Sequence, residues 1–569
     1  MKKKFCFKKK GFTLIELLAV IVILAIILLI AMPIVLNVIS EAKKGAFEST
    51  ARGLIKTVEN EYMKNAINGS SEIITYTFEE GVQSVEPNTY PDLTFSGRGP
   101  ANGYIRVYAD GSSEMKITDG TWYVEKEREN SDIASAVLYD DQSLEPGVVE
   151  VITFVKTFGG SDGFEWFTSV IQTNDGGYVT VGQSDSTDGD VEGLNKGDSD
   201  ALIVKYDAGG NIEWNRNFGG SDREWLATVI QASDGGYVAV GHSASTDGDL
   251  EGLNKGFADA VIVKYDNSGN IEWNHNFGGS WEDQFYSVSQ TSDGGYIAGG
   301  FSNSTDGDLT GLNKGGIDGI IVKYDASGNV EWNRNFGGTG VEYFEELSQT
   351  SDGGYIVFGW SPSTNGDLAG LNKGEIDGII VKYDASGNIE WNRNFGGSSW
   401  DAFYSGIQTS DGGYIVFGDS ESNDGDLAGL NKGDYDGIIV KYDVSGNVEW
   451  KYSYGGTDSE SFFHGIQTSD GGYFATGYSA SNDGDLAGLN KGIEDGVLVK
   501  FDMNGNVEWK RNFGGSSTDD FWGATQTSDG GYVVVGYSYS IDGDLEGLIG
   551  DEENGISVIA KYNSSGTLD

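Results

Sequence analysis

Paired acids recur along the chain at a spacing that could bind a hard cation. In the first such stretch, SDSTDGD, two serines and Asp188 precede Gly189, which matches the opening of a calcium-binding loop. Serines replace two of the expected acids, however, and Asn195 stands where a bidentate glutamate would complete the site. Two interpretations stay open, calcium ligands or Asx-type turns with solvated carboxylates. The candidate calcium ligands are Asp188 and Asp190, Asp247 and Asp249, Asp306 and Asp308, Asp424 and Asp426, and Asp483 and Asp485.

Side chains that could catalyse a reaction are less well supported. The three histidines, His242, His275 and His464, fall at three different phases of an internal repeat, so they indicate neither a metal-binding ring nor a triad. Cys6 is the only cysteine, which excludes an internal disulfide and a cysteine-based metal site. Acid pairs are too frequent in this chain to identify a catalytic dyad. We therefore expect no enzymatic activity and no cofactor other than calcium.

The net charge limits the classes of partner. The chain has 87 Asp and Glu against 37 Lys and Arg, a formal net charge of −50 at pH 7. Such a field repels nucleic acid and anionic lipid headgroups, so we expect neither to bind the body of the protein. Cations and neutral polymers are compatible with it. The 87 glycines against six prolines indicate many tight turns and favour an all-β body.

One unit repeats seven times in the C-terminal part of the chain. The tetrapeptide DGGY recurs every 59 residues, and each unit reads as four strands, in the first copy EWFTSVIQT, YVTVGQS, ALIVKYD and IEWNRNF. Four antiparallel strands per repeat predict propeller blades, with a β-solenoid or a string of small domains as the alternatives. The seven DGGY motifs start at Asp175, Asp234, Asp293, Asp352, Asp411, Asp470 and Asp529.

The two ends of the repeat array favour a closed ring. The last copy stops after its third strand, while residues 151–158, VITFVKTF, match a fourth strand. Pairing these strands would complete the last blade and remove the exposed sheet edges. We therefore predict that residues 151–569 form a seven-bladed β-propeller with four strands per blade. The unit resembles the propeller-like DGGY and GN-x-x-W repeats of bacterial surface proteins, a resemblance that implies little about chemistry.

Two residue types keep their places in the repeat. The tryptophan of the fourth strand is expected to fill the space between blades, with stacking against a sugar as the alternative. The glutamine before each DGGY is expected to form a repeated hydrogen bond, with a pore-lining ring as the alternative. The tryptophans are Trp214, Trp273, Trp332, Trp391, Trp450 and Trp509. The glutamines are Gln172, Gln231, Gln290, Gln349, Gln408, Gln467 and Gln526.

Seven aromatic side chains that vary among the copies form the candidate ligand-binding site. If the fourth strand is outermost, the FGGS link and the long DGD connection share one rim of the channel, and the short DGG and SGN turns share the other. The inner strand begins at the first rim with an apolar core residue and a varied aromatic neighbour. These aromatics suit a glycan or a surface protein, with packing beneath neighbouring loops as the alternative. They are Trp166, Trp225, Tyr286, Tyr343, Tyr404, Phe463 and Trp522.

A single acid, Glu16, stands at the start of a long apolar segment. As a helix, the uncharged residues 17–40 would extend roughly 36 Å, enough to cross a hydrocarbon layer of about 30 Å. A carboxylate at the edge of such a helix costs a few kcal/mol unless it is paired. An ordinary signal peptide is the alternative, but the apolar run is too long for a removed signal, and the small residue Gly11 precedes it.

The sequence KKKGFTLIELLAVIVILAIILLIAMPIV resembles the start of type IV prepilins and of the pseudopilins of related secretion systems. The resemblance implies cleavage after Gly11 by a prepilin peptidase, methylation of the new terminal Phe12, and a helix kink at Pro33. The ammonium group of Phe12 in a neighbouring subunit could then pair with Glu16 inside a helical bundle. Residues 1–11 would be a cleaved leader, and residues 12–40 a transmembrane and assembly helix.

The next segment, residues 41–150, is predicted to form a small α+β domain. Apolar residues at spacings of three and four extend the helix to about Asn68 and Gly69. The stretches ITYTF, YIRVYADG and TWYVEKE read as short strands. A long N-terminal helix on a small antiparallel sheet is similar to the head of a pilin. The apolar helix positions are Phe47, Ala51, Leu54, Val58, Tyr62 and Ala66.

Two kinds of function are compatible with this organisation. In the first, the protein is a minor pilin or pseudopilin-like subunit of a type IV pilus or type II secretion-like filament, and its propeller serves adhesion or ligand binding. In the second, it is a structural or assembly component of the machine, or a membrane-anchored surface protein outside filaments. We expect a single membrane helix with an extracellular bulk. The expected partners are the prepilin peptidase, other pilin subunits, the membrane, and a glycan or surface protein.

Overall fold

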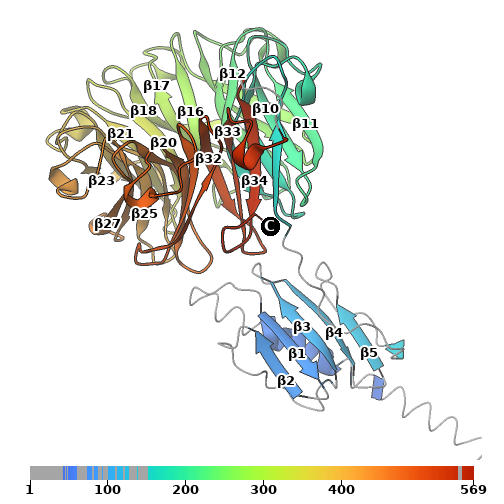
Figure 1. Cartoon of the computed structure of the whole chain (residues 1–569). Helices are drawn as coiled ribbons and strands as arrows, with labels where there is room; N and C mark the ends of the chain where they lie inside the picture. Colours follow the sequence, from blue (N-terminus) through green and yellow to red (C-terminus); the bar gives the residue numbers. More distant parts are fainter. Residues whose placement is uncertain are drawn as a thin grey trace, which may run out of the picture. The chain divides into compact units, whose positions relative to one another are not determined.

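The computed structural model describes the repeat region and parts of the N-terminal region. The described residues are 43–44, 47, 49–59, 74–79, 82–86, 93, 100, 102–108, 112–118, 122–126, 137–138, 152–548 and 554–568. The chain forms two compact units, Met1–Val149 and Glu150–Asp569 (Figure 1). The predicted leader, cleavage site and transmembrane helix, residues 1–40, lie outside the described residues. Within the described part, no helix is long and apolar enough to span a membrane.

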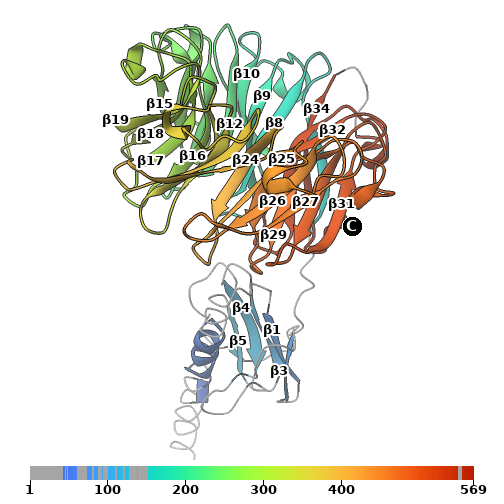
Figure 2. The same ribbon diagram turned by 90° about the vertical axis from the view of Figure 1, so that its left-hand side faces the viewer.

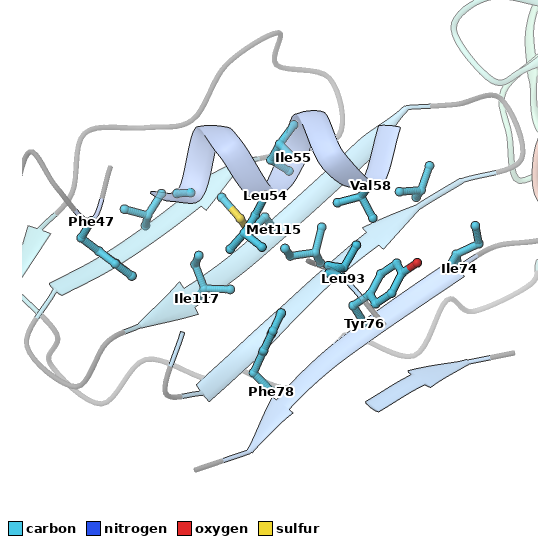
Figure 3. Close-up of a cluster of buried hydrophobic side chains, with 14 residues drawn as sticks. Phe47, Leu54, Ile55, Val58, Ile74, Tyr76, Phe78, Leu93, Met115 and Ile117 are labelled. Atoms are coloured by element: carbon cyan, nitrogen blue, oxygen red, sulfur yellow. The ribbon is translucent and has the colours of Figure 1, made fainter. Parts of the chain in front are cut away.

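The N-terminal unit contains a six-stranded antiparallel sheet in the order β2-β1-β3-β4-β5-β6. Its strands are β1 (Ile74–Glu79), β2 (Val82–Glu86), β3 (Asn102–Val107), β4 (Ser113–Thr118), β5 (Trp122–Lys126) and β6 (Val137–Leu138). Residues 49–59 are helical, and the helix packs Leu54 and Val58 against Tyr76 and Met115 of the sheet (Figure 3). The stretches ITYTF, YIRVYADG and TWYVEKE overlap β1, β3 and β5. Strands β2, β4 and β6 are additions to the prediction.

The C-terminal unit contains seven four-stranded antiparallel sheets, one for each repeat, which confirms the predicted propeller (Figures 1 and 2). The first strands are β8 (Glu165–Gln172), β12 (Glu224–Gln231), β16 (Asp283–Gln290), β20 (Tyr343–Gln349), β24 (Asp401–Gln408), β28 (Glu460–Gln467) and β32 (Asp519–Gln526). The second strands are β9 (Tyr178–Ser184), β13 (Tyr237–Ser243), β17 (Tyr296–Ser302), β21 (Tyr355–Ser361), β25 (Tyr414–Ser420), β29 (Tyr473–Ser479) and β33 (Tyr532–Ser538).

The third and fourth strands complete the blades. The third strands are β10 (Asp200–Tyr206), β14 (Asp259–Tyr265), β18 (Asp318–Tyr324), β22 (Asp377–Tyr383), β26 (Asp436–Tyr442), β30 (Asp495–Phe501) and β34 (Ile556–Tyr562). The fourth strands are β11 (Ile212–Phe218), β15 (Ile271–Phe277), β19 (Val330–Phe336), β23 (Ile389–Phe395), β27 (Val448–Tyr454), β31 (Val507–Phe513) and β7 (Phe154–Phe158). Short 3₁₀ turns lie between second and third strands, at η1 (Gly189–Val191), η2 (Gly248–Leu250), η3 (Gly307–Leu309), η4 (Gly366–Leu368), η5 (Gly425–Leu427), η6 (Gly484–Leu486) and η7 (Gly543–Leu545).

The ring closes by two kinds of contact. Strand β7 pairs with β34, so the last blade takes its fourth strand from the start of the repeat region. The first strands contact one another in sequence, and β32 contacts β8, which makes them the inner wall of the ring. Each glutamine before DGGY accepts a hydrogen bond from the turn of the preceding blade. The bond from the Ser528 backbone N–H to Gln172 Oε1, at 2.7 Å, completes that circle.

The repeated Trp and Lys residues stabilise the outer part of the blades. Trp214 lies 6.0 Å from the ring of Tyr237 in the next blade, as expected for a residue that fills the space between blades. Lys205 is buried, and its Nζ contacts Asp175 at 3.2 Å and Glu213 at 2.9 Å. The lysine therefore anchors the aspartate that begins DGGY. The same arrangement, with small differences, recurs from blade to blade.

Candidate ligand-binding channel

Every inner strand carries a β-bulge at the same position. In β8, Phe167 pairs with Gly182 and Ser169 pairs with Val181, so Thr168 between them has no partner residue on β9. The same register shift occurs in the other six inner strands. A residue in a bulge lies outside the regular ladder and re-aims the side chains around it. The bulge position can therefore differ among blades without disturbing the pairing.

The seven bulge residues line one cavity of about 600 Å³ in the centre of the ring. They are Thr168, Ala227, Tyr286, Glu345, Tyr404, Phe463 and Trp522. Adjacent positions on the inner strands, including Trp166, Trp225 and Glu346, contribute to the same lining. The volume is in the range of pockets that hold small molecules.

Six of the seven predicted aromatic residues line this cavity and form a continuous row, which we call the aromatic arc. Ring-centroid distances along the arc are 5.7 Å from Tyr404 to Phe463, 4.0 Å to Trp522, 4.7 Å to Trp166, 5.6 Å to Trp225 and 5.8 Å to Tyr286. The arc therefore runs through the inner strands of six blades. Only the blade that contains β20 contributes no ring to it.

The seventh predicted residue, Tyr343, lies beside the end of the arc, with 6.2 Å between its ring and that of Tyr286. It stacks on Trp360 of the neighbouring strand, with 4.5 Å between ring centroids, and lies 4.5 Å from Phe301 of the preceding blade. Tyr343 is not part of the cavity lining. The alternative from the sequence was packing beneath neighbouring loops, whereas these ring contacts of Tyr343 are to the strands β21 and β17.

Two carboxylates occupy the gap in the aromatic arc. Burial raises the pKa of Glu345 to about 7, although Trp360 Nε1 donates a hydrogen bond to it at 2.9 Å. Burial also raises the pKa of Glu346 to about 7, and the Gly406 backbone N–H donates to it at 3.0 Å. No Lys or Arg lines the cavity among the described residues. The sequence signal for this pair was available, because no other blade has an acid at either position.

Unpaired polar atoms also lie buried in the wall around this cavity. Two of the three histidines, His242 and His464, line the cavity although they occupy different phases of the repeat. Burial lowers the pKa of each to about 4, so both are neutral at pH 7. Within the described part of the chain, the Nδ1 atoms of both histidines and the indole Nε1 atoms of Trp166, Trp225 and Trp522 have no hydrogen-bond partner. His275 lies apart, against Trp273 of β15.

The acids predicted as calcium ligands hold the link between blades. The Ser221 backbone N–H donates to Asp247 Oδ1 at 2.7 Å, and the Gly219 N–H donates to Asp249 Oδ2 at 3.1 Å. Lys196 of the preceding blade also contacts Asp249, at 2.6 Å. These bonds place the FGGS link and the DGD connection on one rim, as predicted. Among the described residues no group of three or more His, Cys, Asp or Glu is arranged to hold a metal ion; calcium binding stays a prediction.

The corresponding acids of other blades make similar contacts. Asp188 accepts the Ser161 N–H and Asp306 accepts the Ser280 N–H. The remaining predicted ligands in this arrangement are Asp190, Asp308, Asp424, Asp426, Asp483 and Asp485. Each therefore has a structural partner.

The N-terminal segment and the fold define a protein with a prepilin-type processing motif and a β-propeller. Residues 6–32 match the family model described as the prokaryotic N-terminal methylation motif, which confirms the resemblance of this segment to prepilins. Gly11, Phe12 and Glu16 lie inside the matched segment, and their individual roles stay predictions.

Several known proteins are similar to longer parts of the chain. The regulatory protein FlaEY of Caulobacter vibrioides is 24% identical over 376 residues, which cover 59% of this chain and 39% of that protein. The chain thus spans well under half of this curated relative. The Pan2 WD40 domain of Neurospora crassa has a TM-score of 0.40 at 9% identity, covering 73% of this chain and 97% of that one. The Cps50 (Swd1) β-propeller domain of Myceliophteria thermophila has a TM-score of 0.39 at 10% identity, covering 73% and 100%.

Proposed function

We propose that the protein is a minor pilin or pseudopilin-like subunit that displays a ligand-binding propeller at the cell surface. The methylation motif at residues 6–32 is the observation that carries this proposal. The helix packed on an antiparallel sheet in Met1–Val149 supports it, because a pilin head has the same combination of elements. The motif implies processing by a prepilin peptidase and assembly through the N-terminal helix.

The size of the second unit favours a minor subunit. Glu150–Asp569 follows the N-terminal unit as a separate compact body. Close helical packing of subunits leaves little lateral room for such a body at every position of a filament. A subunit used sparsely, or at the tip, avoids this crowding.

Processing and assembly can be tested together by expressing the full chain in a cell that makes type IV pili. Mass spectrometry of the mature protein is expected to find N-methylated Phe12 at the terminus. The variant Glu16→Ala should stay in the membrane and be lost from sheared filaments, because it lacks the carboxylate that pairs with the neighbouring terminal ammonium. The matched control is Glu41→Ala, an acid outside the matched motif.

Immunogold labelling of the filaments separates this proposal from its alternatives. Sparse or tip labelling supports a minor subunit. Normal amounts of the Glu16→Ala protein in sheared filaments, or processed protein that never enters filaments, would instead favour an assembly component or a membrane-anchored surface protein.

A further inference from the structure

The central cavity of the propeller brings an apolar wall and two acids together. All six residues of the aromatic arc line it and keep part of their surface accessible. Glu345 and Glu346, which are also partly accessible, occupy the gap in that arc. The unpaired nitrogen atoms of Trp and His lie buried in the wall, so a ligand in the cavity would not contact them. The main groups that a ligand can reach are therefore apolar ring surface and carboxylate oxygen atoms.

A second hollow, of about 650 Å³, lies over the DGG turns. It includes Gln349 and Gln408, which already bond to neighbouring turns. None of its described lining residues is charged. The central cavity is therefore the better site for a ligand.

We propose that the central cavity binds a small organic ammonium ion with an apolar body. Its ammonium group lies at Glu345 and Glu346, and its apolar body lies against the aromatic arc. This inference rests on the proposed function insofar as the propeller is a ligand-binding module. It does not depend on processing or on filament assembly.

The carboxylates argue for a cation. Trp360 Nε1 donates to Glu345 Oε1, whereas Oε2 has no hydrogen bond among the described residues and is not one of their buried unpaired atoms, so a ligand can reach it. No Lys or Arg lines the cavity in the described part of the chain. A ligand that displaces water from these carboxylates without pairing with them leaves the cost of desolvation uncompensated. An ammonium group supplies the missing partner, and the net charge of −50 attracts it.

The aromatic arc argues for an apolar body on that cation. Tyr286, Glu345 and Tyr404 occupy the bulge position in three consecutive blades, so Glu345 has an arc residue on either side. Trp166 and Trp522 belong to the first and last blades, which in a ring of seven lie opposite the blade that carries Glu345. A ligand with a charged end and an apolar body can therefore contact the carboxylates at one end and the rings along its length.

A bare metal ion suits this cavity less well. A hard cation such as calcium takes six to eight oxygen ligands, and the aromatic arc supplies almost none. Among the described residues no group of three or more His, Cys, Asp or Glu is arranged to hold a metal ion. An organic ion instead gains roughly 25 cal/mol for each Å² of apolar surface that it buries against the rings. The cavity volume of about 600 Å³ suits such a ligand.

The test is calorimetry of the full-length protein in a non-ionic detergent at pH 8, above the raised pKa of about 7 of both carboxyl groups. The probes are phenethylamine, which has both features, 2-phenylethanol, which has a hydroxyl group in place of the ammonium group, and methylamine, which lacks the apolar body. Phenethylamine is expected to bind at least about tenfold more tightly than either other probe. Titration into detergent alone corrects for probe that enters the micelles.

Variants assign the binding to the cavity. Glu345→Gln/Glu346→Gln should weaken phenethylamine binding by about tenfold or more and leave 2-phenylethanol binding unchanged, because only the amine pairs with the carboxylates. The control is Glu375→Gln, an exposed acid of the same blade, which should leave the affinity for every probe unchanged. The comparison of probes uses the natural protein, so it decides the question even if the double variant does not fold.

Four results would each overturn the proposal. They are equal affinity for phenethylamine and 2-phenylethanol, equal affinity for phenethylamine and methylamine, no binding of phenethylamine, and full affinity for phenethylamine in the double variant. A protein that binds phenethylamine as expected but never enters filaments would leave this inference standing and contradict the proposed role in filaments.

Discussion

Each blade has an outer part whose contacts recur around the ring and an inner edge whose residues do not. On the outside, Lys323 contacts Asp293 and Glu331 in the same way as Lys205 contacts its two acids. On the inside, the bulge position ranges from Ala227 to Trp522. Seven blades share the same packing requirement but surround a single channel. Repetition therefore marks the framework of this molecule, and variation marks the place where a ligand would contact it.

The largest effect is expected from a change in the framework at Gly359 of β21. A Cβ atom there would lie 1.9 Å from the Tyr343 carbonyl oxygen, a backbone atom that cannot move without breaking the ladder. We expect Gly359→Ala to destabilise the propeller by about 3 kcal/mol or more, measured by thermal unfolding. The control Gly209→Ala meets only flexible side chains at 3.3 Å. Similar unfolding temperatures for both variants would contradict the prediction.

A smaller loss is expected from the outer lysine. Lys323→Met removes the bonds to Asp293, Glu331 and the Tyr324 carbonyl, which lies 3.0 Å from Nζ. Because the Tyr324 carbonyl loses this donor and two carboxylates lose their cation, we expect a loss of about 2 kcal/mol in thermal or urea unfolding. Lys314→Met is the matched control, since its partner Asp367 is in a partly exposed pair of little net value. Equal losses would show that burial of the lysine is unimportant.

Replacing the two cavity acids, Glu345 and Glu346, should stabilise the propeller, whereas replacing the outer lysine should destabilise it. The size of this gain depends on pH. The pKa of Glu345 and Glu346 is raised to about 7 in the folded protein, so the folded state holds these protons more tightly than the unfolded state. Their contribution to stability is present at low pH and is lost as the pH rises through about 7. Between pH 5 and 8, Glu345→Gln/Glu346→Gln should gain about 2 kcal/mol for each carboxyl group replaced, relative to the natural protein.

Other buried titratable groups near the cavity do not affect the difference in stability between the natural protein and the double variant. Asp419 and Asp520, whose pKa is also raised to about 7 by burial, are present in both proteins, as are His242 and His464. Thermal unfolding at several pH values measures the difference. Parallel curves for the variant and the natural protein would show that these two carboxyl groups are not strained in the fold.

The smallest effect on stability is expected from the aromatic arc itself. Trp166→Phe relieves an unsatisfied buried indole N–H, which favours folding, and loses part of the ring packing, which opposes it, so we expect a net change within about 1 kcal/mol. Trp281→Phe, an exposed tryptophan outside the cavity, is the control. A large loss of stability in Trp166→Phe would assign this residue to the framework and remove it from the candidate site.

The sequence predicted the propeller because its period is strict and every blade has the same strands. It also named all six residues of the aromatic arc, whose ligand-binding role stays a prediction. The bulge was not predictable, because the shift between Phe167 and Ser169 depends on how the inner strand pairs with its neighbour. Glu345 stands at a repeat position where the other blades have no acid, but this signal is weak in a chain with 87 acidic residues. His242 and His464 occupy different repeat phases, yet the curvature of the ring brings both strands to one cavity.

The N-terminal unit was less predictable for a different reason. It has no repeat against which one strand can be checked with another. Strand β4 alternates buried and partly buried residues from Ser113 to Ile117, but the run is short and begins with polar side chains. Its place in the sheet depends on pairing with β3 and β5, its neighbours in the chain, which its own short pattern does not specify.

The pairing of β7 with β34 also has a mechanical consequence. The chain enters the propeller through the outermost strand of the last blade, held to its neighbour by the ladder from Ser557 and Phe158 to Lys561 and Phe154. Tension that arrives along the chain from the N-terminal side is therefore borne first by this one ladder, before any inner strand. Under such tension the propeller would open first between β7 and β34. The inner strands around the cavity would carry force only after that ladder had separated.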